Sequence, residues 1–393
     1  MHLRFVVTLA VLLSCVPFLR VHGVDSGVVR TNVLDDQNFF PIAVWLQNPN
    51  NAGRFKEAGI NLYIGLYRGP TAEQLEMLRK HGMHVICRQS ERSLVFKDDP
   101  TIVAWMHDDE PDNAQPLPQG QKGWGPPVLP VVIQEDYEKI RAKDPTRPVF
   151  LNLGQGVAWD HWIGRGVRRN HPEDYPEYVK GADIVSFDIY PVVHDNKEVA
   201  GKLEFVGRGV ERLRKWAGEE SKRMVWNCIE AARVDNPDVK ATPEQIRSEV
   251  WMSIISGSRG IVYFVHQFKP NFVEASLLED PVTLAGVTKI NAEVKELAAV
   301  INSPAVESEF EIKTEPKVEI ASMVKRLGGT NYLFTVSMEN RAAEVTIKSA
   351  ELARVGKVEA IGESREMKIS DGELRQRFEP YQVHLYRFRA DPK

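Results

Sequence analysis

The sequence predicts an α/β fold, in which a (β/α)8 TIM barrel over residues 36–303 is followed by a small C-terminal antiparallel β-sandwich domain over residues 305–391. Three observations favour this fold: eight short apolar runs, helical signals between them, and a change of hydrophobic period after residue 304. The chain has 393 residues, of which 43% are hydrophobic. This is enough material for one large buried core.

The eight apolar runs have the length and the continuous hydrophobicity of parallel strands that are buried on both faces. They span residues 40–46, 61–67, 84–89, 102–107, 149–153, 184–189, 224–229 and 260–264. Eight such runs in strict alternation with helices over roughly 250 residues are typical of a (β/α)8 barrel. A doubly wound open sheet is the alternative, but no G-x-G-x-x-G or G-x-x-x-x-G-K-[ST] motif follows the first run.

Helix signals lie between these runs. Thr71 with Gln74, and Thr242 with Gln245, have the spacing of a capping box, and Pro243 takes a favoured first helical position. After the eighth run, apolar residues recur every three or four positions from residue 284 to residue 297. This spacing predicts a helix with a single apolar stripe.

Beyond residue 304 the hydrophobic period changes from helical to two. Residues 332–338 alternate between apolar and more polar side chains, and Gly328-Gly329 predicts a hairpin turn between this run and residues 318–326. Further strand-like runs at residues 343–347, 357–361, 374–378 and 382–388 complete the predicted β-sandwich. We expect a structural role for this domain, and carbohydrate binding is the alternative.

The first 23 residues predict a secretory signal peptide. A basic start precedes an apolar run that is too short to span a bilayer, and Val21 and Gly23 suit positions −3 and −1 of a signal-peptidase site. A lipoprotein anchor at Cys15 is the alternative. We therefore expect an exported protein, secreted or periplasmic, that has no membrane contact after the leader is cleaved.

Composition narrows the classes of function. With 50 basic and 54 acidic residues the net charge is −4, which argues against a nucleic-acid binder. Cys87 and Cys228, the two cysteines outside the leader, lie on nearly opposite sides of the predicted barrel, so we expect free buried thiols. The motifs H-E-x-x-H, C-x-x-C and G-x-S-x-G do not occur, so we expect no metal, no cofactor and no serine nucleophile.

The fourth and seventh runs each lead to a glutamate, Glu110 and Glu230. The C-terminal ends of barrel strands meet around one mouth, so these two side chains can face the same cleft. Glycoside hydrolysis needs two carboxyl groups that flank one bond. Acidic neighbours of Glu110 favour its protonated form, whereas Glu230 would need hydrogen-bond donors to stay ionised. The alternative interpretation is a solvated acidic loop and a carboxylate at a helix start.

These strand ends resemble those of the clan A retaining glycoside hydrolases, whose acid/base glutamate ends strand four and whose nucleophile glutamate ends strand seven. The resemblance covers residues 36–303, and residues 378–384 also look like the C-terminal domain of several such enzymes. It implies that Glu110 is the acid/base and Glu230 the nucleophile in a double displacement on a poly- or oligosaccharide. The clan's usual asparagine before the acid/base glutamate is Asp109 here, which leaves the contact to the sugar 2-hydroxyl group open.

Other strand ends supply candidate substrate-binding side chains. These are Trp45, Arg68, Arg88, Asp109, Asn152, Tyr190 and His266. Arg68 or Arg88 can keep Glu230 ionised through a charge-assisted hydrogen bond. Tyr190 resembles the tyrosine with which some clan members orient the nucleophile. The alternative role for these residues is structural, in the barrel core or at its rim.

The long segment 154–181 combines aromatic and basic side chains, among them Trp159, Trp162, Arg165 and Arg168. Exposed aromatic rings stack on sugars, and a basic cluster would suit an acidic glycan. A solvated loop is the alternative interpretation of the arginines. The predicted function is thus a secreted retaining glycosidase, and the alternative is a non-catalytic glycan-binding protein on the same barrel.

Overall fold

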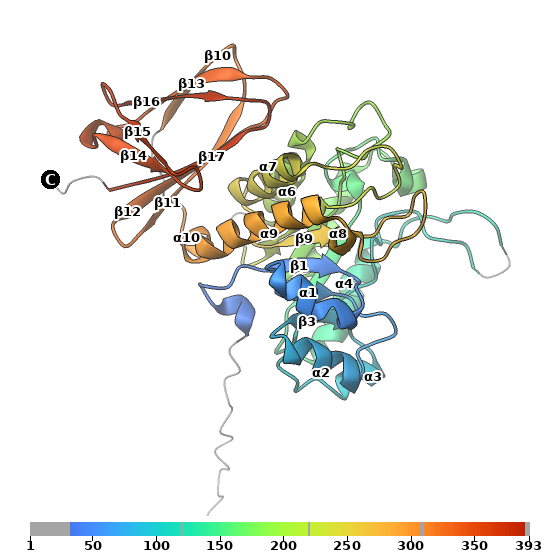
Figure 1. The fold of residues 1–393 in the computed structure, drawn as a ribbon. Coiled ribbons are helices and arrows are strands. Elements are labelled where there is room, and N and C mark those ends of the chain that lie inside the picture. Colours follow the sequence, from blue (N-terminus) through green and yellow to red (C-terminus); the bar gives the residue numbers. More distant parts are fainter. Residues whose placement is uncertain (1–31, 119–120, 219–220, 307–309, 390–393) are drawn as a thin grey trace, which may run out of the picture. The chain divides into compact units, whose positions relative to one another are not determined.

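The predicted parallel barrel is present in the computed structural model, which describes residues 32–118, 121–218, 221–306 and 310–389 (Figure 1). Its strands are β1 (Ile42–Trp45), β2 (Leu62–Ile64), β3 (His84–Arg88), β4 (Ile102–Met106), β5 (Val149–Leu153), β6 (Ile184–Phe187), β7 (Met224–Val225), β8 (Asn227–Glu230) and β9 (Ile261–Phe264). All eight predicted runs are strands. The predicted leader with Cys15 lies outside the described residues.

The barrel closes through the seventh predicted run. Strands β1 to β7 pair in parallel in sequence order, and β9 pairs with both β1 and β8. The strands β7 and β8 are two parts of one run that is interrupted only at Trp226. This run therefore contacts β6 along its first part and β9 along its second part, and no free edge remains.

Helices follow the strands and cover the barrel; Figure 1 shows α6, α7 and α9 side by side. The α-helices are α1 (Ala52–Glu57), α2 (Ala72–Lys80), α3 (Glu91–Leu94), α4 (Pro130–Lys143), α5 (Tyr175–Tyr178), α6 (Glu204–Ala217), α7 (Pro243–Ile255), α8 (Ser276–Glu279), α9 (Pro281–Glu296) and α10 (Ala298–Asn302). Both predicted capping boxes are confirmed, because Thr71 and Thr242 exchange hydrogen bonds with Gln74 and Gln245. Helix α9 buries the predicted stripe.

Short 3₁₀ helices fill several connections. They are η1 (Val33–Asp35), η2 (Pro49–Asn51), η3 (Gln155–Val157), η4 (Ile163–Arg168), η5 (Pro172–Asp174), η6 (Val179–Gly181) and η7 (Leu352–Arg354). Four of them, η3 to η6, lie in the long connection between β5 and β6. Among the described residues, we find no helix with the length and hydrophobicity needed to cross a membrane.

The C-terminal part of the chain forms two antiparallel sheets. One sheet has the order β10-β13-β16 and the other the order β11-β12-β17-β14-β15. The strands are β10 (Glu311–Glu315), β11 (Ile320–Leu327), β12 (Thr330–Ser337), β13 (Ala343–Lys348), β14 (Lys357–Ala360), β15 (Arg365–Lys368), β16 (Glu373–Phe378) and β17 (Val383–Phe388). Leu333 and Tyr386 from one sheet and Ile347 and Phe378 from the other share one hydrophobic cluster, as in a sandwich.

The hairpin predicted at Gly328-Gly329 is confirmed. Both glycines have positive φ angles, 56° and 75°, and they connect the paired strands β11 and β12. An added Cβ would meet nothing within 4 Å at either position, so the backbone conformation is what requires glycine.

Alternate residues of the strands fill the barrel interior. On the seventh run, Trp226 and Cys228 point inward, while Asn227 faces helix α7 and donates a hydrogen bond to Ser253 Oγ at 2.8 Å. Cys87 packs with the outer, helix-facing cluster. The two thiols are therefore free and buried, as predicted. The same alternation sets which side chains at the strand ends reach the mouth of the barrel.

Candidate active site

A cavity of about 900 Å³ lies at the C-terminal ends of the barrel strands. Its lining comes from the residues that end or directly follow six of the strands. They include Trp45, Asp109, Glu110, Asn152, Asp188, Tyr190, Cys228, Phe264 and His266. Convergence of polar side chains from separate strands in one concave site is the usual setting for catalysis in this fold.

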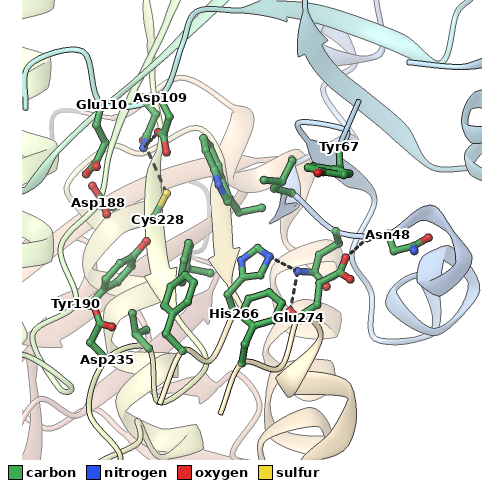
Figure 2. A pocket seen from close by; sticks show the side chains of 18 of the residues that line it. Asn48, Tyr67, Asp109, Glu110, Asp188, Tyr190, Cys228, Asp235, His266 and Glu274 are labelled. Atoms are coloured by element: carbon green, nitrogen blue, oxygen red, sulfur yellow. Dashed lines mark hydrogen bonds between the residues drawn. The ribbon is translucent and has the colours of Figure 1, made fainter. Parts of the chain in front are cut away.

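Three carboxyl groups meet in this cavity: Asp109 and Glu110 after β4, and Asp188 after β6. Figure 2 shows the side chains of Glu110 and Asp188 pointing toward one another, with Asp109 beside them. Glu110 and Asp188 lie side by side, close enough to share one proton, and the side chain of Tyr190 lies next to Asp188 (Figure 2). One of the two carboxyl groups must carry the shared proton, so the pair holds an acid next to a carboxylate.

The backbone around Glu110 is held in an unusual conformation. Glu110 has a φ of 44°, a left-handed value that costs energy in a residue with a side chain. Its N–H donates to the Asn152 carbonyl at 3.1 Å, while the Asn152 side chain donates to Asp109 Oδ1 at 3.0 Å. Asn152 of the neighbouring strand β5 therefore helps to fix the positions of both Asp109 and Glu110. Strain of this kind is commonly retained at functional sites.

Asp112 fixes the loop after β4 to the connection between β5 and β6. Its carboxyl group is fully buried and accepts hydrogen bonds from the Gly154 N–H and the Tyr175 hydroxyl group, each at 2.9 Å. The Arg165 guanidinium lies 4.0 Å away. Asp112 thus joins the β4 loop to the β5–β6 connection and has a structural role.

The electrostatics of the cavity favour protonated acids. Burial, followed by the charges of Asp188 and Asp112, raises the pKa of Glu110 well above its usual value. Although Asp109 is open to the cavity, the surrounding walls and the charge of Glu110 raise its pKa to about 7. Burial also raises the pKa of Asp188. The predicted effect of acidic neighbours on Glu110 is therefore present, except that Asp108 points outward and pairs with Arg88.

Glu230 does not line the cavity, so the expectation that Glu110 and Glu230 face one cleft is wrong. Its side chain is fully buried, and its two oxygens accept hydrogen bonds from the backbone N–H groups of Val192 (2.6 Å) and Val193 (2.9 Å). It also lies next to the carboxyl group of Glu249 on helix α7. Alternation on β8 would point Glu230 inward with Trp226 and Cys228, but the hydrogen bonds from Val192 and Val193 hold its carboxyl group away from the cavity. The hydrogen-bond donors that Glu230 was predicted to need in order to stay ionised are these two main-chain N–H groups.

Two predicted arginines lie outside the cavity as well. Arg68 is exposed and its guanidinium lies 5.1 Å from the centre of the Tyr67 ring. Arg88 pairs with Asp108 at 2.5 Å, with both side chains about two-thirds exposed (66% and 65%). The prediction that one of them holds Glu230 ionised is wrong, because the strand ends that carry them do not reach its buried position.

The other predicted binding residues do line the cavity: Trp45, Asp109, Asn152, Tyr190 and His266. Burial lowers the pKa of His266, and its Nε2 lies 3.1 Å from Gln47 Nε2, so the imidazole acts there as a neutral acceptor. Cys228 forms part of the cavity floor, with its sulfur 3.9 Å from Asn152 Oδ1. Whether these groups contact a sugar stays a prediction.

Two arginines of segment 154–181, Arg165 and Arg168, form ion pairs within the protein. Arg165 is 1% exposed and bonds Asp174 at 2.7 Å, and Arg168 bonds the other oxygen of Asp174 at 2.5 Å. Of the tryptophans, Trp162 lines the cavity, whereas Trp159 is buried and donates to Glu198. Arg165 and Arg168, two members of the basic cluster expected for an acidic glycan, therefore pair with Asp174.

The sequence interpretation missed Asp188 and three aromatic residues at the rim. Asp188 has a detectable signal, because it continues the inward alternation of Ile184 and Ser186 on β6. Tyr67, Phe268 and Phe272 are 68%, 45% and 62% exposed and border the cavity. They lie in loops without periodicity, so no pattern in the sequence marks them.

Fold and cavity together place the chain in the class of (β/α)8 barrels with an appended β-sandwich. No protein-family model matches the sequence. No curated protein matches it either.

Several solved structures are similar in fold. Gan42B, a GH42 beta-galactosidase from G. stearothermophilus, has a TM-score of 0.56 at 8% identity, covering 91% of this chain and 99% of its own. AmyP in complex with maltotriose has a TM-score of 0.55 at 10% identity (92% and 99%). Alpha-galactosidase I from Mortierella vinacea has a TM-score of 0.53 at 10% identity (92% and 100%). At such identities the likeness establishes the fold.

Proposed function

We propose that the protein is a glycoside hydrolase that cleaves a poly- or oligosaccharide at the mouth of its barrel. The observation that carries this proposal is the meeting of Glu110, Asp188 and Asp109 in one cavity with aromatic walls. Cleavage of a glycosidic bond needs an acid at the leaving oxygen and a negative charge near the anomeric carbon. The names of the similar structures, two galactosidases and a protein bound to maltotriose, support the proposal by analogy of fold.

In the proposed reaction, Glu110 is the general acid and Asp188 the nucleophile. Glu110 suits the acid role because burial and its acidic neighbours favour its protonated form. Asp188 attacks the anomeric carbon while Glu110 protonates the leaving oxygen. Glu110 then removes a proton from a water molecule as the water oxygen attacks the anomeric carbon. The bond between the sugar and Asp188 breaks in this step. Asp109, held by Asn152, is placed to accept a hydrogen bond from a sugar hydroxyl group.

The contact between the two acids favours retention of the anomeric configuration. Retaining glycosidases hold their two carboxyl groups about 5 to 5.5 Å apart, and inverting ones roughly 6.5 to 9.5 Å apart, with room for a water molecule. Glu110 and Asp188 are within hydrogen-bond reach of one another. A bound sugar must move the two carboxyl groups apart. As their separation grows, it reaches the distance of retaining enzymes before that of inverting enzymes. We propose this pair in place of Glu110 with Glu230.

The charge of the cavity favours a neutral sugar. Five acidic residues are among its described lining residues, which include no lysine or arginine. Besides Glu110, Asp188 and Asp109 these are Asp235 and Glu274. A carboxylated or sulfated sugar would meet repulsion from several sides. We therefore propose a neutral saccharide and not the acidic glycan considered from the sequence.

A panel of aryl glycosides and oligosaccharides tests this proposal. We expect the protein to hydrolyse at least one neutral member, with kcat/KM at least about tenfold higher than for the matched uronide, because like charges repel in a site shielded from water. The difference should shrink at high salt. Binding of neutral sugars without any turnover would support the glycan-binding alternative, and equal rates on the uronide would contradict the charge argument.

We also propose that the protein is exported. The support is the signal-peptide pattern of residues 1–23, with release after Gly23. Export would place the enzyme, secreted or periplasmic, where polysaccharides from outside the cell are met.

A further inference from the structure

Glu230 and Glu249 form a buried pair of acids that the proposed reaction does not use. Both residues are 0% exposed. Glu249 lies on helix α7, and among the described residues no group donates a hydrogen bond to either of its carboxyl oxygens, while the charge of the adjacent Glu230 raises its pKa. No cationic side chain is among the groups that act on either pKa. Two adjacent carboxylates without a counter-ion are very costly in a protein interior, so the pair holds one proton.

The two glutamates of the pair differ in the hydrogen bonds that they accept. Glu230 accepts two backbone N–H groups, at 2.6 and 2.9 Å, which favours its carboxylate form. Glu249 accepts no such donors, and burial with the charge of Glu230 raises its pKa well above the usual value. Glu249 is therefore the protonated partner, next to the carboxylate of Glu230. A single negative charge is left, and it faces the main chain.

The two N–H groups that Glu230 holds belong to the connection that carries the candidate nucleophile. Val192 and Val193 follow Asp188 by four and five residues, and Tyr190 lies between Asp188 and Val192 in the sequence. The side chain of Tyr190 in turn lies next to Asp188 (Figure 2). Because both carboxylate oxygens bind consecutive amides, Glu230 fixes the direction of this segment as well as its distance from the barrel.

We infer that Glu230 is a positioning residue, which holds the segment 188–193 so that Asp188 and Tyr190 face Glu110 across the cavity, with Glu249 as the proton donor that lets Glu230 stay ionised. This inference rests on the proposed function for its effect on catalysis. Its structural part, the hold on Val192 and Val193, is independent of any reaction. Apolar side chains of similar size would fill the same volume but would leave two buried N–H groups without acceptors.

Amide hydrogen exchange and steady-state kinetics on the whole protein test the inference with two matched variants. Glu230→Gln loses one acceptor oxygen and presents an N–H₂ group to a backbone N–H. We expect exchange of Val192 and Val193 to become at least about tenfold faster, the factor that corresponds to one lost hydrogen bond. On a neutral glycoside, kcat should fall about 10- to 100-fold with KM nearly unchanged, because the nucleophile is displaced and the binding walls are not.

Glu249→Gln is the control, since its amide still donates to Glu230 and cannot ionise. Its exchange at Val192 and Val193, and its kcat, should stay close to those of the wild type. Wild-type kcat in Glu230→Gln, or unchanged exchange, would overturn the inference. Rescue of Glu230→Ala by azide would also overturn it, because it would identify a nucleophile.

Two further readouts keep the test decisive. If Glu230→Gln fails to fold, amide exchange in the wild type still tests the inference. The amides of Val192 and Val193 must exchange slowly there, and fast exchange would contradict their hydrogen bonds to Glu230. If the protein cleaves no glycoside, the proposed function fails while the exchange result still judges the hold itself.

Discussion

Glu110→Gln is expected to lower kcat by about 10³-fold on glycosides with poor leaving groups, within the range that general acid catalysis supplies. Gln cannot protonate the leaving oxygen, although it fills the same space. A 2,4-dinitrophenyl glycoside needs no such proton, so its first step should be almost unaffected. The measurement is kcat/KM across leaving groups of different basicity, which reports the first step.

The matched control for this variant is Asp108→Asn. Asp108 lies two residues earlier on the same loop, but its side chain is exposed and pairs with Arg88 at the surface. Exposed pairs contribute little, so we expect wild-type rates. An equal loss for good and poor leaving groups in Glu110→Gln would remove the acid role from Glu110.

Asp188→Asn should lower kcat by on the order of 10⁴-fold or more, as removal of a central catalytic group does in other hydrolases. The amide can neither attack the anomeric carbon nor balance the positive charge that develops there. Any residual activity should also change its pH dependence. The charge of Asp188 raises the pKa of Glu110, so its removal lowers that pKa. The acid must be protonated to act, and the basic limb of the pH profile therefore moves to lower pH.

Asp195→Asn is the control in the same connection. Its side chain is 99% exposed, and we expect no change in rate or pH profile. A variant Asp188→Asn with wild-type kcat, or with an unchanged basic limb in its residual activity, would contradict the assigned pair.

The barrel could be predicted because its physical causes are local. Continuous apolar runs, capping boxes at Thr71 and Thr242 and the Gly328-Gly329 turn each determine structure within a few residues. The strands β10 and β15 escaped prediction because they carry mostly exposed charged residues and little alternation. Edge strands of this kind are set by their pairing partners in the sandwich.

The site could be predicted only in part. Asn152 reaches the cavity because it continues the inward alternation of Phe150 on β5, whereas Glu110 lies beyond the end of β4 and is held there by the hydrogen bond from its N–H to the Asn152 carbonyl. Glu230 was misplaced because two free amides in a distant connection capture its carboxylate, an interaction that no pattern along the sequence reveals. Asp188 was overlooked although alternation on β6 points it inward. Alternation along a strand predicts the direction of a side chain only where no long-range hydrogen bonds override it, as those from Val192 and Val193 do at Glu230.

The central claim is that Asp188, paired with Glu110 in the cavity, is the group that bonds to the sugar. Incubation with a 2-deoxy-2-fluoro glycoside of a sugar that the enzyme cleaves, followed by peptide mapping, tests it directly, because the fluorine slows release of the covalent intermediate. The account predicts a single sugar attached to Asp188. A label on Glu230 or Asp109, or complete turnover with inverted product and no label, would contradict it.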